Sequence, residues 1–566
     1  MVLQSLPCLD DYVGGQAVAQ TPALTALNLR YCNSLASLPE SKIDQLRGLT
    51  SLQLNQCRDL TSLPESLGQL TALTALQIPA CARIAQLPDS LGQLTALLKL
   101  DLSDCSSLTA LPELACRLTA LVTLNMHGCR ALTHLPEALG HLAALTELDL
   151  NDCARLRSLP AWLGQLMALR ALQLAHCAAL PALPASSWQL SHVTALRLVG
   201  CQALTGLPEL LGELTALREL LLSGCARVAR LPDSLGQLAS LTLLDATACR
   251  ALTRLPEALG GLTALTTLSL RTCTALACLP ESAGGMAALT RLDMTWCKAV
   301  TRLPDSAGQL AALRELCLDD CTRLEALPES LGQLMSLASV RLCRCRALAC
   351  CFSLAALPDS LGRLRTLHAL KLRLCRSLRS LPESLGRLIA LRSINLHSCE
   401  ALTALPDSFG QLMRLTALNL KQCTALTSLP ESFGQLAALP SLDLTGCASL
   451  VALPASFGQL TGLQELSLHR CASLAALPDS LPALQSLNLS ECTALRALPD
   501  TLGQLAVLTE LNLKECRALT ALPAAMGSLG TTARTLGLRI FVQGCQGGLK
   551  GAIQELGRMR AWNVIM

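Results

Sequence analysis

Leucine positions recur along most of the chain in one fixed pattern. The repeating unit reads L-x-x-L-x-L-x-x-C-x-x-L-x-x-L-P-[ED]-S-[LF]-G-Q-L-x-A, and residues 63–81 (LPESLGQLTALTALQIPAC) and 303–321 (LPDSAGQLAALRELCLDDC) follow it. The segment L-x-x-L-x-L alternates apolar and polar residues, which predicts a short strand with one buried face. The segment L-P-[ED]-S predicts the start of a helical turn, because proline has no N–H to leave unpaired there and the acid favours the positive end of the helix dipole. The glycine four residues after the proline is expected to end or loosen that turn.

A cysteine closes each unit and makes the period visible. The spacing is 24 residues from Cys57 to Cys345, from Cys375 to Cys471 and between Cys492 and Cys516. One strand and one turn cannot bury their leucines alone, whereas stacked coils can, so the period predicts one elongated α/β solenoid. The cysteine ladder is Cys57, Cys81, Cys105, Cys129, Cys153, Cys177, Cys201, Cys225, Cys249, Cys273, Cys297, Cys321, Cys345, Cys375, Cys399, Cys423, Cys447, Cys471, Cys492 and Cys516, with Cys32 and Cys545 as outermost members.

From about residue 22 to residue 545 the chain resembles the leucine-rich repeat family. The resemblance implies a horseshoe or superhelix with a concave parallel β-sheet and short helical turns on the convex side. In that family the cysteine position is more often Asn, which binds the backbone of neighbouring loops; Cys is a small substitute that can lie buried as a weak donor. We therefore expect a structural ladder rather than a metal or redox column, since no acid or His recurs at matching spacing. Residues 487–505 (LNLSECTALRALPDTLGQL) resemble the repeats of plant intracellular nucleotide-binding disease-resistance receptors and related stand-alone repeat proteins.

The pattern predicts three regions along the chain. Residues 1–21 are a partial or degenerate N-terminal repeat, 22–545 a solenoid of about 22 units, and 546–566 a C-terminal capping segment. The period breaks at a six-residue insertion near 346–352, at a shortened unit between Cys471 and Cys492, and at a longer unit between Cys516 and Cys545. These changes either kink the superhelix or record decayed repeats. Because the first residues already fit the second half of a unit, we expect a fragment of a longer protein or a misplaced start.

Composition narrows the class of protein. The chain has 566 residues, of which 51% are hydrophobic and 2% aromatic, and the mean hydropathy is +0.43. No run of 18 apolar residues is present, so no spanning helix is predicted, and the first residues do not form a secretory signal. The 29 cysteines therefore indicate reduced thiols in a cytoplasmic protein. The net charge of +4 is too small to predict binding to nucleic acid or to a membrane.

One stretch of the chain departs from the background charge. Between Ser339 and Arg392 there are eleven Lys or Arg residues and two acids. Some of these cations fall at outward strand or strand-end positions, and a Trp beside charges is typical of an interface anchor. The alternative is a solvated charge cluster with the Trp packed over a loop. The candidate partner-binding residues are Trp296, Asp319, Asp320, Arg341, Arg344, Lys371, Arg373 and His397.

Catalytic and metal-binding signatures are missing from the sequence. It contains no G-x-x-x-x-G-K-[ST], no H-E-x-x-H, and no G-x-S-x-G at a strand-to-helix turn, so we predict no enzymatic activity and no cofactor. Cys317, Cys343, Cys350 and Cys351 lie near one another in sequence, but their spacing matches zinc sites poorly, and no metal site is predicted. Few aromatic side chains lie among the basic residues, which disfavours nucleic acid as a partner.

The pattern and the resemblance together predict a non-catalytic protein–protein recognition module. Its partner, another protein or a peptide, would bind the concave face, in immune or signalling sensing. A rigid, pre-organised surface of this kind binds with little ordering cost. Two alternatives stay open: a ligand-sensing fragment of a larger nucleotide-binding receptor, and a substrate adaptor for a ubiquitin ligase.

Overall fold

The computed structural model describes residues 2–3, 24–184, 190–345, 354–523, 525–526, 538–560 and 563–565; for residues 2, 3, 556, 557, 559 and 560 it describes the backbone alone. The chain divides into two units, Met1–Leu276 and Ala277–Met566. The predicted six-residue insertion near 346–352, which includes Cys350, Cys351 and Phe352, lies outside the described residues. None of the described helices is long and apolar enough to cross a membrane.

In the first unit, short parallel strands alternate with single helical turns. The strands are β1 (Val2–Leu3), β2 (Ala26–Asn28), β3 (Ser51–Gln53), β4 (Ala75–Gln77), β5 (Lys99–Asp101), β6 (Thr123–Asn125), β7 (Glu147–Asp149), β8 (Ala171–Gln173), β9 (Ala195–Arg197), β10 (Glu219–Leu221), β11 (Leu243–Asp245) and β12 (Thr267–Ser269). The turns are the α-helix α2 (Glu40–Ile43) and the 3₁₀ helices η1 (Glu65–Gln69), η2 (Asp89–Gln93), η3 (Glu113–Arg117), η4 (Glu137–His141), η5 (Ala161–Gln165), η6 (Glu209–Glu213), η7 (Asp233–Gln237) and η8 (Glu257–Gly261).

The second unit has the same construction and ends on a longer helix. Its strands are β13 (Arg291–Asp293), β14 (Glu315–Cys317), β15 (Ser339–Arg341), β16 (Ala369–Lys371), β17 (Ser393–Asn395), β18 (Ala417–Asn419), β19 (Ser441–Asp443), β20 (Glu465–Ser467), β21 (Ser486–Asn488), β22 (Glu510–Asn512), β23 (Arg539–Phe541) and β24 (Asn563–Ile565). Its helices are η9 (Glu281–Gly285), η10 (Asp305–Gln309), η11 (Glu329–Gln333), η12 (Asp359–Arg363), η13 (Glu383–Arg387), η14 (Asp407–Gln411), η15 (Glu431–Gln435), η16 (Ala455–Gln459), η17 (Asp500–Gln504) and the α-helix α3 (Gly547–Arg560).

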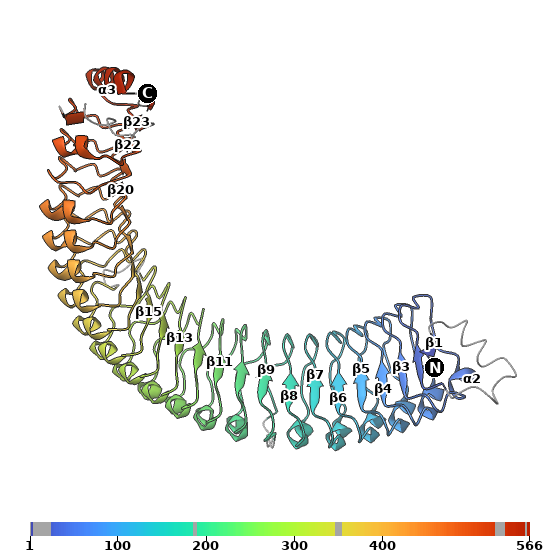
Figure 1. Cartoon of the computed structure of the whole chain (residues 1–566). Helices are drawn as coiled ribbons and strands as arrows, with labels where there is room; N and C mark the ends of the chain where they lie inside the picture. The colour runs from blue at the N-terminus through green and yellow to red at the C-terminus, as the bar shows by residue number, and fades with distance from the viewer. Residues whose placement is uncertain are drawn as a thin grey trace. The chain divides into compact units, whose positions relative to one another are not determined.

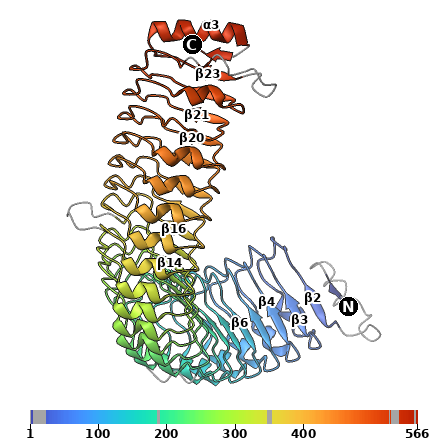
Figure 2. The same cartoon turned by 60° about the vertical axis from the view of Figure 1, so that its left-hand side comes forward.

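Within each unit the strands lie on one side of the coils and the 3₁₀ turns on the other (Figures 1 and 2). Leu76 in the middle of β4 lies opposite Leu100 of β5, and both are buried. The same register continues across the insertion, where Val340 pairs with Leu370. The predicted α/β solenoid with a parallel sheet and short helical turns is therefore confirmed.

The glycine of each turn has a different role from the one expected. Gly284 lies inside η9 rather than at its end, and a methyl group there would lie 2.5 Å from the Ser306 carbonyl oxygen and 2.6 Å from Gln309 Oε1. Gly284 is not among the residues with positive φ. The expectation that this glycine ends or loosens the turn was wrong. Glycine is favoured here because successive turns approach closely, although η3 carries Cys116 at the same position.

The acid of the turn also works between coils. The two carboxylate oxygens of Glu383 accept hydrogen bonds from the backbone N–H groups of Asp407 and Ser408 in the next turn, at 3.0 and 3.1 Å. Glu431 binds the following turn in the same way. The first N–H groups of a helix have no partner within it, so each of these glutamates satisfies donors of its neighbour.

Each strand leads into a bend that ends at the ladder cysteine. The residue before the cysteine often has positive φ without being glycine, as at Ala248 (60°). Its N–H binds the next coil, where it donates to the Arg271 carbonyl oxygen at 2.6 Å. The polar residue that ends the strand binds the backbone of its own coil, as when Asn125 Oδ1 accepts a hydrogen bond from the His127 N–H at 3.0 Å. The polar residues at the strand ends therefore stabilise the bend and also face solvent.

The ladder thiols are buried and point at the backbone. Cys225 Sγ donates to the Leu198 carbonyl oxygen of the preceding coil with an S–O distance of 2.9 Å, and most of the ladder repeats this bond. Burial raises the pKa of Cys105 and of Cys273 to about 12. Cys105 and Cys273 are therefore protonated at neutral pH and serve as weak donors between coils.

We expect the ladder thiols to resist alkylation in the folded protein. With iodoacetamide near neutral pH, the exposed Cys278 should react on the order of a hundredfold faster than Cys105 or Cys273, which become accessible only when the coils separate. Peptide mass spectrometry after timed quenching measures the three rates. The chain unfolded in guanidinium is the control, in which the rates should converge. Similar rates in the folded chain would contradict the buried ladder.

The close approach of the turns predicts opposite effects for two glycine substitutions in the second unit. Gly284→Ala should lower the free energy of unfolding by about 1–3 kcal/mol, because the methyl group meets the Ser306 backbone. Gly551→Ala in α3 has nothing within 4 Å and should raise stability by up to about 1 kcal/mol through helix propensity. Urea titration followed by circular dichroism compares them. An unchanged midpoint for Gly284→Ala would show that the turns can move apart.

Candidate functional site

The candidate residues lie where five neighbouring strands of the second unit, β13 to β17, end. Three rows of residues run across these strands, and all eight predicted partner-binding residues fall on them. The strand-end row is Asp293, Cys317, Arg341, Lys371 and Asn395. The second row, two residues later, is Thr295, Asp319, Cys343, Arg373 and His397. The bend row, one residue further, is Trp296, Asp320, Arg344, Leu374 and Ser398, all with positive φ.

Asp319 and Arg341 are bound to each other. Asp319 is only 5% exposed, and its Oδ2 accepts from Arg341 Nη2 at 2.6 Å and Nε at 2.8 Å. Its Oδ1 accepts from the Cys343 backbone N–H at 2.8 Å. The hydrogen bond to Asp319 raises the pKa of Arg341. Removing Arg341 would leave a buried carboxylate without its cation, which is strongly destabilising, so the pair belongs to the scaffold of the site.

Asp320 and Arg344 form a second, more open pair one row further. Their side chains approach to 3.4 Å, with Arg344 exposed and the Asp320 carboxylate mostly covered. The Asp320 N–H donates to the Cys343 carbonyl oxygen at 2.7 Å, which fixes the backbone of the bend. At the start of β13, Arg291 bridges Glu315 at 2.6 Å and Asp293 at 3.4 Å. The acidic half of the candidate site is therefore largely neutralised by its own cations.

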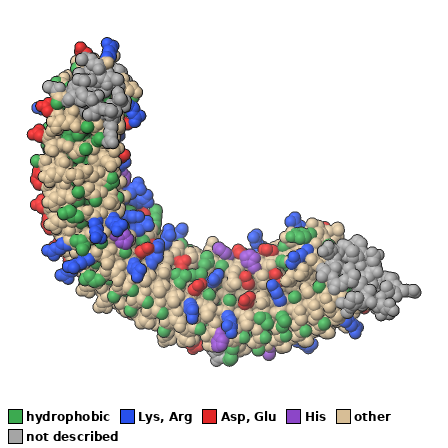
Figure 3. Space-filling model, in the orientation of Figure 1, with side chains coloured by type: hydrophobic (Ala, Val, Ile, Leu, Met, Phe, Trp, Pro, Cys, Tyr) green, Lys and Arg blue, Asp and Glu red, His purple; other side chains and the backbone are tan. Residues whose placement is uncertain are grey.

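Lys371 and Arg373 differ from these paired cations. Both are exposed, and neither has a carboxylate oxygen within 4 Å in the part of the chain that the structure describes. Figure 3 shows Lys and Arg side chains gathered over the coils that Figure 1 draws in yellow. In the second row, Lys421 continues the series but pairs with Asp443 at 2.8 Å. Two free positive charges thus stand in neighbouring rows of the β16 coil.

His397 lies half-buried beside these charges. Its N–H on the backbone donates to Asn395 Oδ1 at 3.0 Å, while its ring Nδ1 has no partner among the described residues. Burial, and then the positive charge of Arg373, lower the pKa of His397 from its ordinary 6.5. The ring is therefore neutral at pH 7, and an approaching anion would favour its protonation.

Trp296 stands at the other end of the rows, three coils from Lys371. Its φ is +65°, its N–H donates to the Asp319 carbonyl oxygen at 2.7 Å, and 41% of the residue is exposed. Lys298 Nζ lies 4.9 Å from the centre of its ring, within the range of a cation–π interaction. The bend thus holds a large aromatic surface outward, with one cation already placed over it.

Two of the thiols that sequence spacing grouped lie in these rows. Cys317 is buried and Cys343 half-buried, and burial raises the pKa of each to about 11. Cys350 and Cys351 lie outside the described residues. Among the residues that are described, no three His, Cys, Asp or Glu side chains form a group able to hold a metal ion. Neutral thiols at this spacing offer a metal little charge.

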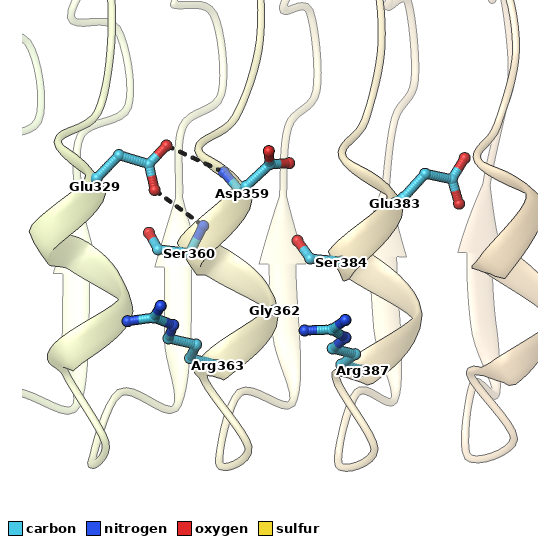
Figure 4. Close-up of a pocket in the computed structure, with 8 residues that line it drawn as sticks. All are labelled: Glu329, Asp359, Ser360, Gly362, Arg363, Glu383, Ser384 and Arg387. Carbon is cyan, nitrogen blue, oxygen red and sulfur yellow. Dashed lines mark hydrogen bonds between the residues drawn. The ribbon is translucent and has the colours of Figure 1, made fainter.

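A hollow of about 420 Å³ lies on the opposite side, between η11, η12 and η13 (Figure 4). The Glu329 side chain spans this hollow, and its carboxylate accepts hydrogen bonds from the backbone N–H groups of Asp359 and Ser360, at 3.3 and 3.1 Å. The Ser360 hydroxyl has no partner among the described residues, yet equivalent serines in many other turns have none either. The hollow is therefore a property of the repeat. What distinguishes it are Arg363 and Arg387, which most other turns replace with Gln.

Sequence reasoning missed the ion pairs that fix the site. Arg291 and Glu315 are 24 residues apart and lie opposite each other in neighbouring strands, as do Arg344 and Asp320 at the bend. Superimposing the repeats at their own period would have aligned these charges. The pairing of Arg341 with Asp319 is diagonal, so the period alone does not indicate it.

Comparison with known proteins gives one family. The sequence model of the family described as leucine-rich repeat region matches residues 13–153 and 345–487, together half of the chain. Comparison with curated proteins found no match. The chain is similar to several solved structures, of which three follow.

A leucine-rich repeat protein of Leptospira interrogans is 22% identical, with 94% of this chain and 100% of that one covered and a TM-score of 0.43. The plant peptide hormone receptor RGFR1 in complex with RGF2 is 19% identical, with 92% and 86% covered and a TM-score of 0.42. The functional domain of InlJ from Listeria monocytogenes, which includes a cysteine ladder, is 17% identical, with 76% and 74% covered and a TM-score of 0.36. On the repeat and the family match, the chain belongs to the leucine-rich repeat family, whose members are in general non-enzymatic protein-recognition scaffolds.

Proposed function

We propose that this chain is a non-catalytic recognition module that binds an acidic segment of another protein at the strand ends of β15 to β17. The observation that carries the proposal is the pair of exposed cations, Lys371 and Arg373, which have no carboxylate partner among the described residues. Their neighbours Arg341, Arg344 and Lys421 are all ion-paired. The chain therefore neutralises most charges of these rows and leaves two available.

The surroundings favour an anionic partner at this position. Charges already paired add little to the field outside the protein, whereas two free cations and a titratable ring attract and orient an incoming carboxylate. The strand-end backbone is held by the β15–β16 and β16–β17 ladders, so it needs no reordering on binding. Trp296, three coils away, offers the apolar contact that interfaces use as an anchor.

A role in immune or signalling sensing, within the cytoplasm, is part of the same proposal. It rests on the resemblance of the repeats to those of plant intracellular receptors. A ligand-sensing portion of a larger nucleotide-binding receptor would use the same surface. A ubiquitin-ligase adaptor would instead bring its partner to a ligase, and a ubiquitination assay with the captured partner separates the two.

Reversing the free charges should strongly weaken recognition and leave the fold intact. In affinity capture with mass spectrometry, Lys371→Glu combined with Arg373→Glu should reduce recovery of specific partners by about tenfold or more, because repulsion replaces attraction. Arg376→Gln is the matched control, since Arg376 is exposed but already pairs with Glu400 at 2.9 Å. Circular dichroism checks the fold of each. If the double variant and the control capture the same partners, the binding site lies elsewhere.

His397 makes partner binding depend on pH. Burial and Arg373 lower its pKa, so an acidic partner should bind progressively more tightly as the pH falls from neutral and the ring takes up a proton. In the free protein the same lowered pKa means that His397 does not reduce the free energy of unfolding above about pH 6.5. It reduces this free energy as the pH falls from there through the pKa of the folded state. His397→Gln should remove the contribution of this ring to the pH dependence of binding and to that of stability. Titration calorimetry with the captured partner measures the first; a flat profile in the unmodified chain would contradict this role.

A further inference from the structure

The outer side of the second unit departs from the repeat in four consecutive coils, at a set of residues that forms an outer patch. Arg363 and Arg387 end η12 and η13. Met335, Arg365, Ile389 and Met413 each follow two residues after the end of their turns, η11 to η14. The outer patch is defined by these six residues: Met335, Arg363, Arg365, Arg387, Ile389 and Met413.

The other coils serve as an internal comparison for these positions. The last residue of a 3₁₀ turn is most often Gln, as in Gln69 and Gln237. Two residues later, every coil with a 3₁₀ turn outside the patch has Thr or Ala, with the single exception of Met167. Small residues at that position satisfy the repeat, so folding does not require the larger side chains at the patch.

The outer patch surrounds a second open hollow, distinct from the one described above. The hollow has a volume of about 820 Å³, within the range of ligand sites, and five of the six patch residues line it. Met335, Ile389 and Met413 are 56%, 61% and 63% exposed. Arg363, Arg365 and Arg387 have no carboxylate within 4 Å in the described part of the chain. In Figure 4 the side chains of Arg363 and Arg387 lie parallel, each reaching back toward the preceding coil.

We infer that the outer patch is a second docking surface, which binds an acidic amphipathic helix of a partner protein. The three apolar side chains offer contact area that is exposed to solvent. The three guanidinium groups among them are suited to bind carboxylates in a bidentate geometry. A helix that carries acids beside apolar residues at a spacing of three or four matches both features. The surface is separate from the strand-end rows and does not depend on the function proposed for them.

An anionic membrane is the main competing occupant, and the neighbouring turns disfavour it. Glu329, Asp359 and Glu383 are exposed on the same outer side, at the starts of the turns that carry the patch. A flat bilayer surface with negative headgroups would lie against these carboxylates as well as the arginines. A helix seated in the hollow contacts the arginines and can avoid the acids at the other end of the turns.

The test uses the residues of the chain's own coils as replacements. The reversal variant carries Met335→Thr, Arg363→Gln, Arg365→Thr, Arg387→Gln, Ile389→Thr and Met413→Thr, which other coils tolerate at the same positions. The matched control carries the same kinds of change in the first unit, Arg117→Gln and Met167→Thr. A phage library of random peptides of about 16 residues, long enough for about four helical turns, is selected against the unmodified chain.

Selection should enrich peptides with acids and apolar residues at helical spacing. These peptides should bind the reversal variant at least about tenfold more weakly, and bind the control and the Lys371→Glu, Arg373→Glu variant unchanged. Failure to enrich such peptides, or equal binding to the reversal variant, would overturn the inference. Sedimentation with vesicles of phosphatidylcholine and phosphatidylserine is the other arm: vesicle binding that only the reversal variant loses would assign the patch to a membrane and overturn the protein partner. Circular dichroism must show that the reversal variant is folded as the control is.

Discussion

Each coil contains too few side chains to bury its own leucines, and the structure follows from the need for a neighbour on either side. Leu76 is covered because Leu52 and Leu100 lie beside it in the ladder. The same dependence sets the polar contacts. The ladder thiol donates backward to the preceding coil, while the bend N–H and the turn glutamate bind forward to the next. Even the glycine found in most turns is favoured by the close approach of the neighbouring turn rather than by its own backbone conformation.

A scaffold that repeats its contacts makes departures from the repeat easy to interpret. Positions that recur in many coils, such as the turn serines whose hydroxyls have no partner among the described residues, are properties of the stack and indicate no ligand. Positions where a few consecutive coils differ are the ones that packing does not dictate. Both surfaces discussed above, the strand ends around Lys371 and the outer patch around Arg387, lie in the same coils of the second unit.

The strands, the turns and the solenoid could be predicted because leucine, proline and cysteine positions report directly on burial and on backbone geometry. The reason for the turn glycine could not, since the distance between neighbouring turns is set by packing and leaves no mark in the spacing. Similarly, the strand β24 after α3 was not expected, because its three residues carry no repeat pattern. The candidate surface residues could be found from charge and period alone. Their division into paired and free cations could not, because the Arg341–Asp319 pair runs diagonally across the register.

The nearest-neighbour character of the contacts also determines how the chain would respond to mechanical force. In the described residues, ladders, turns and thiol bonds join only adjacent coils, and no disulfide ties distant ones. A molecule pulled from one end would therefore lose its coils one after another rather than in a single rupture. A coil of 24 residues releases about 80 Å of extended chain. Under increasing force its extension would rise in discrete steps, and the size of each step would correspond to the length of one repeat.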